Sequence, residues 1–390
     1  MAAAKRAPVT EPALQGFKYF RVLGPLFAHL RTAGPGRDRA GNRQLFYDQY
    51  ATLLLLYFFS PVVTSLRGLQ QVTTLAKVQQ RLGIRRTSLG ALSEAARVFD
   101  AALLREVIAE LALRVRAQGA PAVEAGLREL IAVDGSLLPA LPRMAWAVWQ
   151  GERHRAAKMH VAFAVLQQAP VGVTVTAGNG SERAELRRLV HPGGLYVCDR
   201  GYTDYALFQE LHDTPCGFII RVQENAAYEV QAERPVSAAA QAAGVRRDCL
   251  IRRLGTAHHT RLLPQPFRVV CVAPGTPHRA GGPAPLVLVT NRLDLEAELV
   301  ALAYRFRWTV ELFFRWLKCV LGCRHLLSQG ANGVHLQVYA AIIASLLISL
   351  WVNRPPTKRT YELLSFYLSG WASEAEVLAH IDRLHLKAPP

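Results

Sequence analysis

The chain has 390 residues, which is too long for one ordinary hydrophobic core and predicts two or three domains. Its composition, 51% hydrophobic and 19% charged, excludes a disordered chain. The net charge of +17 predicts a polyanionic partner, because an excess of cations attracts phosphate backbones whatever their sequence. A membrane surface is the competing partner, but neither terminus carries a basic amphipathic anchor.

The amino-terminal sequence MAAAKRAPVTEP lacks the apolar core of a secretory signal. Two apolar runs, Leu53–Phe59 and Tyr339–Val352, are shorter than the ~18–20 residues that a membrane span needs, so we interpret both as buried helices. The six cysteines form no C-x-x-C pair, which favours a reducing compartment. These features predict a cytoplasmic protein without a membrane partner.

The first third of the chain is predicted to be helical after a basic, flexible lead-in over residues 1–45. Residues 46–120 form the predicted helical domain, in which Gly83 ends one helix and Ser88 or Thr87 caps the next. This helix pair has the length of a helix-turn-helix, so Arg85 and Arg86 in its turn are candidate DNA contacts. An ordinary helical bundle with a basic loop explains the same pattern.

Residues 127–223 change to short apolar runs and predict an α/β domain. The predicted order is β-β-β-α-β-α-β, which indicates a mixed sheet with helices on its faces. Two of the runs break at Asp134 and Asp199. Polar residues at the ends of such strands face the ligand crevice, so these aspartates are candidate site residues.

The remainder contains a β-rich insertion over 224–291 and a return to the α/β domain over 292–353, followed by short helices over 354–390. Within residues 292–353, the segment YRFRWTVELFFRWLK (304–318) is predicted to be a single helix. At 100° per residue, one face within about a 60° arc carries a carboxylate among cations and a phenol. That face comprises Tyr304, Arg307, Glu311 and Lys318, with Arg315 and Trp308 near its edge and Val310, Leu312, Phe313 and Leu317 opposite.

This charged face has two interpretations. It is either an amphipathic surface with one ion pair, between Glu311 and Arg307 or Arg315, or a metal-ligating glutamate beside phosphate-binding side chains. The second interpretation needs further carboxylates, and Asp134 and Asp199 supply them. Each aspartate alone has a structural explanation, in a turn or in a pair with Arg200. Three carboxylates together would repel one another unless cations held them.

The spacing Y-x-x-R-x-x-x-E-x-x-x-x-x-x-K at Tyr304, Arg307, Glu311 and Lys318 resembles the signature of bacterial insertion-sequence DDE transposases. The D-G at 134–135 and the D-R-G-Y at 199–202 resemble the first and second acidic motifs of that family. Three separate motifs occur in the required order, and the β-rich interruption lies where the family has one.

The resemblance implies a ribonuclease-H-like catalytic domain in which Asp134, Asp199 and Glu311 ligate two Mg²⁺ ions, with Mn²⁺ as a substitute. It implies nicking of element ends and attack of the freed 3′-hydroxyl on target DNA. The implied partners are double-stranded DNA with terminal inverted repeats, target DNA and a second copy of the chain, in the nucleoid. The expected DNA contacts are Tyr304, Arg307 and Lys318, together with Arg315, Arg200, Arg85 and Arg86.

One departure puts a DNA-hairpin step in doubt. Relatives that form a hairpin hold a flipped base with an aromatic side chain of the insertion, but residues 224–291 contain no Trp. Trp146, Trp149 and Trp308 lie elsewhere; they could stack a base, but a place in the core is the favoured interpretation. His258-His259 could hold a metal, but no carboxylate or Cys stands at ligand spacing, so a solvated loop is favoured. A DNA-binding regulator without cleavage and a stand-alone nuclease on the same fold remain the alternative functions.

Overall fold

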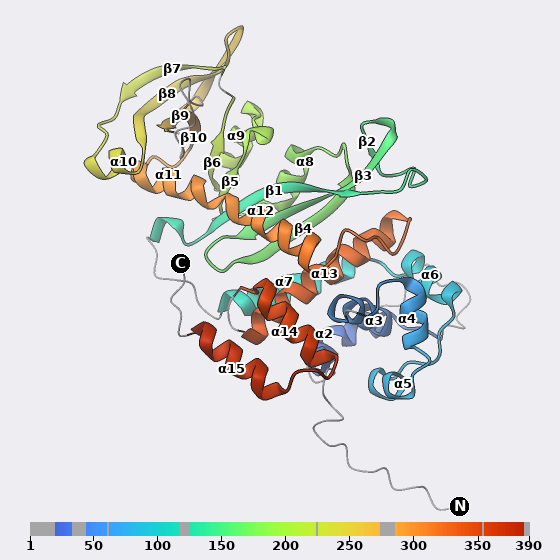
Figure 1. The fold of residues 1–390 in the computed structure, drawn as a ribbon. Helices are drawn as coiled ribbons and strands as arrows, with labels where there is room; N and C mark the ends of the chain where they lie inside the picture. The colour runs from blue at the N-terminus through green and yellow to red at the C-terminus, as the bar shows by residue number, and fades with distance from the viewer. Residues whose placement is uncertain are drawn as a thin grey trace, which may run out of the picture. The chain divides into compact units, whose positions relative to one another are not determined.

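The computed structural model describes residues 20–32, 44–60, 62–117, 125–223, 225–273, 285–352 and 355–385 (Figure 1). The chain forms two compact units. The unit that we call the helical unit draws its described residues from Met1–Val115, Pro139–Ala147 and Arg315–Pro390. The unit that we call the sheet unit comprises Arg116–Leu138 and Val148–Phe314.

The helical unit is built around two helices that are apolar nearly all round, α3 and α13, which pack against each other. Because such helices bury every side, the other helices surround them. α2 and α14 also pack on α3, and α6 packs on α13. The helices of this unit are α2 (Phe20–Thr32), α3 (Tyr47–Phe59), α4 (Leu66–Val72), α5 (Ala76–Leu82), α6 (Leu89–Val98), α7 (Ala102–Ala117), the π-helix η3 (Trp316–Val320), α13 (Ala331–Val352), α14 (Lys358–Leu368) and α15 (Glu374–His385).

Two predictions for the amino-terminal part are wrong in detail. The flexible lead-in contains α2, whose Leu26, Phe27 and Leu30 are buried; the rest of residues 1–43 lies outside the described ranges. The helix predicted before Gly83 is two helices, because the hydroxyls of Thr73 and Thr74 donate to carbonyls three residues earlier and interrupt the helical pattern. The predicted caps are confirmed: Gly83 has φ +62°, and the Ser88 side chain accepts from the Ala91 amide.

α13 is, in the described part of the chain, the one helix long and apolar enough to cross a membrane. It has 22 residues, more than the apolar run from which it was predicted. In the apolar 18-residue stretch of α13 that meets this criterion, 83% of the residues are buried inside the protein. The predicted role as a buried core helix is therefore confirmed.

The sheet unit contains a 10-stranded mixed sheet with the order β2-β3-β1-β5-β6-β10-β9-β8-β7, and β4 also pairs with β3. β1, β5 and β6 run parallel, and β6 pairs antiparallel with β10. The strands are β1 (Leu130–Pro139), β2 (Val148–Trp149), β3 (Gly151–Ala164), β4 (Ala169–Ala177), β5 (Leu195–Cys198), β6 (Gly217–Arg221), β7 (Ala226–Glu233), β8 (Val245–Thr256), β9 (His259–Val272) and β10 (Leu286–Thr290). The predicted mixed α/β fold is confirmed, and β3 and β4 pair antiparallel as a hairpin.

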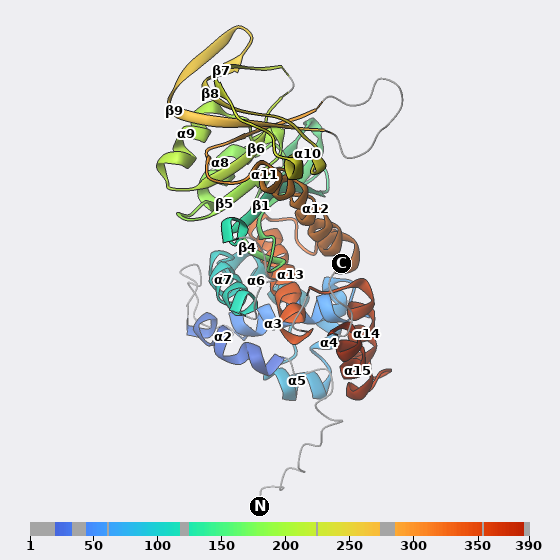
Figure 2. The ribbon, with the colours of Figure 1, turned by 90° about the vertical axis from the view of Figure 1, so that its left-hand side faces the viewer.

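Helices cover both faces of this sheet (Figures 1 and 2). On one face, α8 (Glu182–Leu189) and α9 (Tyr205–Asp213) enclose a core that includes Val133, Cys198 and Phe218. On the other face lie α11 (Ala297–Phe306) and α12 (Trp308–Arg315), where Phe313 packs against Phe163 at 4.9 Å between ring centroids. Successive residues of a strand point to opposite faces, so Asp134 and Asp199 point toward α11 and α12.

The residues predicted as a separate β-rich insertion, 224–291, continue the central sheet. β10 lies between β6 and β9, so the segment shares one hydrogen-bonded sheet with the strands before it. Residues 292–353, predicted to belong to the α/β domain, are divided between the two units. Residues from Arg315 onward, including α13, belong to the helical unit, because α13 buries its apolar surface against α3.

The helix predicted over 304–318 is divided at Arg307. The Arg307 amide donates to the Tyr304 carbonyl, three residues earlier, so a tightened turn joins α11 to α12. A π-helical turn, η3, then follows at Trp316–Val320. A π-turn holds more residues than an α-turn, so Lys318 is not aligned with Tyr304, Arg307 and Glu311 on one helix face. The predicted position of Lys318 on that face is therefore wrong.

Candidate functional site

Three charged side chains lie side by side along three neighbouring parallel strands, within β1, just after β5 and at the end of β6. The register pairs Ala132 with Val197 and Cys198 with Ile220. Continuing both ladders in step places Asp134 beside Asp199, and Asp199 beside Arg221. The first four residues of β1 are buried, and Asp134 is half-buried. The strand itself continues to Pro139, so the predicted strand break at Asp134 is wrong.

Both aspartates are oriented by the backbone of their own turns. Asp134 accepts from the amide of Gly135 at 2.7 Å, and Asp199 accepts from the amide of Gly201 at 2.8 Å. Asp199 is also the N-cap of the short helix η2 (Arg200–Tyr202). Each carboxylate is thus held in one orientation through its Oδ1 atom.

α12 brings Glu311 close to Asp134, and Arg307 links the two carboxylates. The guanidinium of Arg307 donates to Glu311 Oε1 at 2.5 Å and contacts Asp134 Oδ2 at 3.4 Å. The side chains of Arg307 and Asp134 are only 16% and 18% exposed, so this pair is shielded from solvent. Of the two ion pairs predicted for Glu311, the structure contains the one with Arg307.

The electrostatics of Asp134 reflect its crowded position. Its pKa is raised to about 6, chiefly by burial, and the nearby Asp199 and Glu311 carboxylates contribute to the increase. The Gly135 amide and Arg307 act in the opposite direction. Ionised Asp134 is therefore unfavourable in the folded protein, as expected where carboxylates converge.

We predict that Asp134→Asn stabilises the protein at pH 7.5. The folded-state pKa of Asp134 lies above the usual 3.8, so the folded state takes up a proton more readily than the unfolded state. The destabilisation by the ionised group is complete above pH 6 and fades toward pH 4. We expect a gain of about 1–2 kcal/mol in the free energy of unfolding at pH 7.5, measured by urea titration without divalent ions.

The same variant should show little gain at pH 4. Asp213→Asn, which removes an exposed carboxylate from the same unit, is the control and should change the unfolding free energy little at either pH. Equal stability of Asp134→Asn and the unmodified protein at pH 7.5 would contradict the crowding of carboxylates.

Tyr304 faces the same group of charges. Burial raises the pKa of its hydroxyl, Asp199 adds to this shift, and Arg307 and Arg221 oppose it. Arg200 is exposed in η2 and has no ion-pair partner among the described residues, so the alternative Asp199–Arg200 pair is not formed. The structure thus brings together Asp134, Asp199, Glu311, Arg307 and Tyr304.

The other predicted DNA contacts are placed elsewhere in the chain. Arg315 is exposed at the end of α12, and Lys318 is half-buried in η3. Arg85 and Arg86 are exposed between α5 and α6 in the helical unit. They share no element with the aspartates.

Two expectations for α12 are wrong. Trp308 was expected in the core but is 51% exposed, and Leu312, expected on the packed face, is 46% exposed. Both lie on the outer side of the helix because Val310 and Phe313 occupy its buried side. Trp146 and Trp149 are half-buried rather than core residues.

The donor set fits a divalent cation in its chemistry. Carboxylate oxygens are the ligands that Mg²⁺ prefers, and here Arg307 provides positive charge against two of the three carboxylates. Within the described ranges, however, no three His, Cys, Asp or Glu side chains are gathered closely enough to ligate one ion. Ligation by all three would therefore need Glu311 to exchange Arg307 for the ion.

Comparison with known proteins identifies the family. Residues 125–347 match the model of the transposase DDE domain, which is more than half of the chain. The chain belongs to the transposase DDE domain family. The matched region includes Asp134, Asp199 and Glu311, and it contains all strands of the central sheet.

Relatives of this DDE family member come from several bacteria. The y4zB protein of Sinorhizobium fredii, named as a transposase, is 30% identical over 220 residues, 56% of this chain and 59% of that protein. The transposase named for insertion sequence element IS5377 of Geobacillus stearothermophilus is 28% identical, over 57% and 56% of the two chains. A third, named for element IS4SA of Synechocystis, is 21% identical over 73% and 78%. The match thus spans little more than half the length of the first two relatives.

Sequence reasoning missed two residues around the site of this DDE domain, Arg221 and Glu182. Arg221 ends β6 and Asp199 directly follows β5, so a charged residue closing the run GFIIR was the available signal. Glu182 begins α8, where the helix dipole alone explains an acid. In the structure it forms an ion pair of 3.2 Å with Lys158 beside the aspartate turns.

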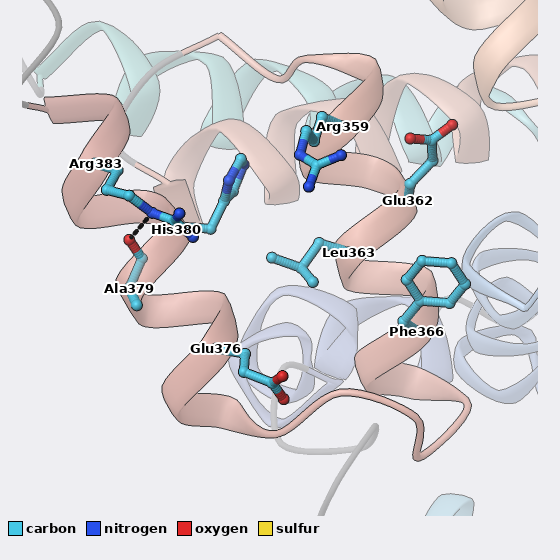
Figure 3. Close-up of a pocket in the computed structure, with 8 residues that line it drawn as sticks. All are labelled: Arg359, Glu362, Leu363, Phe366, Glu376, Ala379, His380 and Arg383. Carbon is cyan, nitrogen blue, oxygen red and sulfur yellow. Dashed lines mark hydrogen bonds between the residues drawn. The ribbon is translucent and has the colours of Figure 1, made fainter.

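A separate hollow of about 300 Å³ lies in the helical unit between α14 and α15 (Figure 3). Cations and carboxylates from both helices line it, including Arg359, Glu362, Glu376 and Arg383. This mixed charge does not favour a polyanion, and none of the predicted site residues lies there.

Proposed function

We propose that this DDE family member is a transposase that nicks the ends of a DNA element and joins the freed 3′-hydroxyl to target DNA. The proposal is supported by the position of Asp134 beside Asp199 on neighbouring strands and by Arg307, which links Asp134 to Glu311 of α12. Acidic groups that face a phosphate backbone weaken binding, so a protein that only bound DNA would gain nothing from them.

The proposed cofactor is a pair of Mg²⁺ ions, with Mn²⁺ as a substitute. Asp134, Asp199 and Glu311 would hold them, and Arg307 would leave Glu311 as they bind. Such a pair, when bound, stabilises both the entering and the leaving oxygen of an in-line phosphoryl transfer. The raised pKa of Asp134 supports this assignment, because a cation would replace the proton that burial favours.

Side chains around the carboxylates are proposed to hold the DNA strand. Arg307 and Arg200 would contact phosphates, and Tyr304 would position the strand beside Asp199. Lys318, Arg315, Arg85 and Arg86 are proposed as further contacts along the DNA. Phosphate contacts of this kind fix the register of the strand at the site rather than reading its sequence.

The arrangement of the sheet supports a ribonuclease-H-like catalytic domain. Its proposed core is β1, β3, β4, β5 and β6 with α8, α9, α11 and α12, and residues 224–291 are proposed as an elaboration of that core. The helical residues 46–120 are proposed as a DNA-binding part. The proposed substrate is DNA with terminal inverted repeats, bound by a homodimer in the nucleoid. Two relatives are named as transposases for insertion sequence elements, which supports a mobile DNA element as the substrate.

The deciding experiment uses the purified chain, Mg²⁺ and a DNA fragment that ends in the inverted repeats flanking its gene. Nicks at the repeat ends and joined products on a target plasmid are expected, and both should disappear with EDTA. Cutting without joining would favour a nuclease. End binding with no cutting in Mg²⁺ or Mn²⁺ would favour a regulator.

Arg307→Ala should weaken binding to element ends and flatten its salt dependence. Loss of one phosphate contact lowers the slope of log affinity against log salt by about one. The measurement is fluorescence anisotropy of labelled end DNA in Mg²⁺ across a KCl series, in an Asp199→Asn background that blocks cutting.

Arg305→Ala is the matched control, because Arg305 is an exposed arginine two residues earlier on α11. Its salt slope should equal that of the background protein. A slope that does not change for Arg307→Ala would remove Arg307 from the DNA interface.

A further inference from the structure

A fourth carboxylate, Glu182, lies against the turns that carry both aspartates. It is the first residue of α8, on the face of the sheet opposite α11 and α12. Its side chain is 27% exposed and pairs at 3.2 Å with Lys158, which is 16% exposed. This ion pair is less exposed than most in the protein and is close to the proposed catalytic residues.

The two glycines that follow the aspartates show how closely Glu182 approaches. A Cβ on Gly135 would lie 3.1 Å from Glu182 Oε1. A Cβ on Gly201 would lie 2.7 Å from Glu182 Oε2 and 3.0 Å from Asp199 Oδ1. One oxygen of Glu182 and one of Asp199 therefore both lie next to the Gly201 Cα, and a side chain there would displace one of them.

A buried histidine indicates that this place accommodates a further group. His160 is fully buried, and its Nε2 lies 2.9 Å from Thr176 Oγ1. The Thr176 hydroxyl donates its hydrogen to the Ala177 carbonyl, so Nε2 must be the donor to Thr176. Burial, with Lys158, lowers the pKa of His160 to about 4, so the ring is neutral and Nδ1 is a bare acceptor.

This acceptor has no partner among the described residues. Nδ1 is 3.4 Å from the position that a Cβ on Gly135 would take, the same position that Glu182 Oε1 approaches. A buried acceptor without a donor is costly, so a donor such as a water molecule is expected there. An acceptor and a carboxylate oxygen thus both lie close to Gly135, in the turn that follows Asp134.

We propose that Glu182 is a positioning residue that increases the affinity of the Asp134–Asp199 side of the site for a divalent cation, and that Lys158 moderates this effect. Glu182 adds negative charge next to Asp199, and Lys158 offsets part of it. Nδ1 of His160 would hold a water molecule beside Gly135. The inference rests on the proposed function, since it assumes that the two aspartates hold the ion.

The test measures Mn²⁺ binding to the purified full-length chain without DNA, by electron paramagnetic resonance of the free ion. We expect Glu182→Gln to weaken binding about tenfold, because a unit charge at this range acts on a divalent ion through partly exposed surroundings. Lys158→Met should strengthen binding by a similar factor. The double variant should return close to the unmodified protein, because the two charge changes cancel.

A purely structural ion pair would give another pattern. Removing either partner would then lower Mn²⁺ affinity and thermal stability together, and the double variant would recover nothing in affinity. That pattern, or unchanged affinity in both single variants, would overturn the inference. Glu182→Asp is the conservative variant and should retain most of the affinity even if Glu182→Gln folds poorly.

Two controls separate this inference from the proposed function. Glu210→Gln removes a 49% exposed carboxylate of α9 and should leave Mn²⁺ affinity unchanged. Asp199→Asn should remove most Mn²⁺ binding. Failure of the unmodified chain to bind Mn²⁺ would reject the proposed function itself. If the unmodified chain binds Mn²⁺ and only Asp199→Asn loses that binding, the role of Glu182 is rejected and the proposed function stands.

Discussion

Asp199→Asn is expected to abolish cutting and joining of element ends while leaving DNA binding intact or slightly tighter. The substitution removes one of two carboxylates at neighbouring strand ends, and loss of metal-dependent stabilisation of the transition state costs several kcal/mol, or ~10³-fold in rate. Binding should survive because a negative charge near phosphates is lost. The fold should survive because an asparagine oxygen can still accept from the Gly201 amide, 2.8 Å away.

Cutting is measured on denaturing gels with end-labelled DNA, and binding by anisotropy on the same DNA. Asp204→Asn is the matched control: it makes the same chemical change five residues later, and asparagine also caps a helix well, so α9 is retained. This control should cut normally. If Asp199→Asn lost binding in step with cutting, Asp199 would be a structural residue.

The second large effect is expected at Arg268, the most deeply buried arginine among the described residues. Its guanidinium pairs with both oxygens of Asp248, at 2.8 and 2.7 Å, and these side chains are 1% and 3% exposed. It also donates to the Leu295 carbonyl, just before α11. Arg268 therefore ties β8 and β9 to the segment that carries Glu311.

Arg268→Met should destabilise the protein by about 3–5 kcal/mol, because the buried Asp248 charge loses its two short hydrogen bonds and keeps only the 3.5 Å contact with Arg234. Cutting should fall as well, since the start of α11 loses its anchor. The measurement is urea unfolding, with cutting assayed well below the transition. Adding Asp248→Leu to the same chain should recover much of the lost stability, because the buried carboxylate is then removed and Arg234, 32% exposed, can be solvated.

Arg252→Met is the control for this prediction. Arg252 also pairs with a glutamate across neighbouring strands, but its side chain is 58% exposed. Exposed pairs contribute about 1 kcal/mol or less, so this variant should unfold almost like the unmodified protein. Equal losses for Arg252→Met and Arg268→Met would show that burial does not distinguish the two pairs.

The sequence was sufficient to predict the class of fold and the elements that carry the acidic residues. Apolar runs that end in a single aspartate indicated strand ends, and the structure places Asp134 and Asp199 on adjacent parallel strands. That adjacency depends on the strand order, which a single sequence does not encode locally. For the same reason Arg221 was missed: its importance comes from lying next to Asp199, not from its own neighbours in the chain.

Other features followed from tertiary packing. The helical period predicted one continuous helix over 304–318, but the tightened turn at Arg307 and the π-turn at Trp316 alter the face that it presents. Glu182 looked like an acid placed for the helix dipole, and only the folded turns bring it to Gly135 and Gly201. Pairings between distant residues, such as Arg268 with Asp248, carried no local signal at all.

The position of β10 has a consequence for shortened versions of this protein. Residues 224–291 look like a removable addition in the sequence, yet β10 occupies the hydrogen-bonding side of β6. Excising the segment would leave the backbone of β6 unpaired and open to strand exchange with another molecule, a known route to aggregation. A smaller relative must therefore retain a strand in this place or cover the exposed edge in another way.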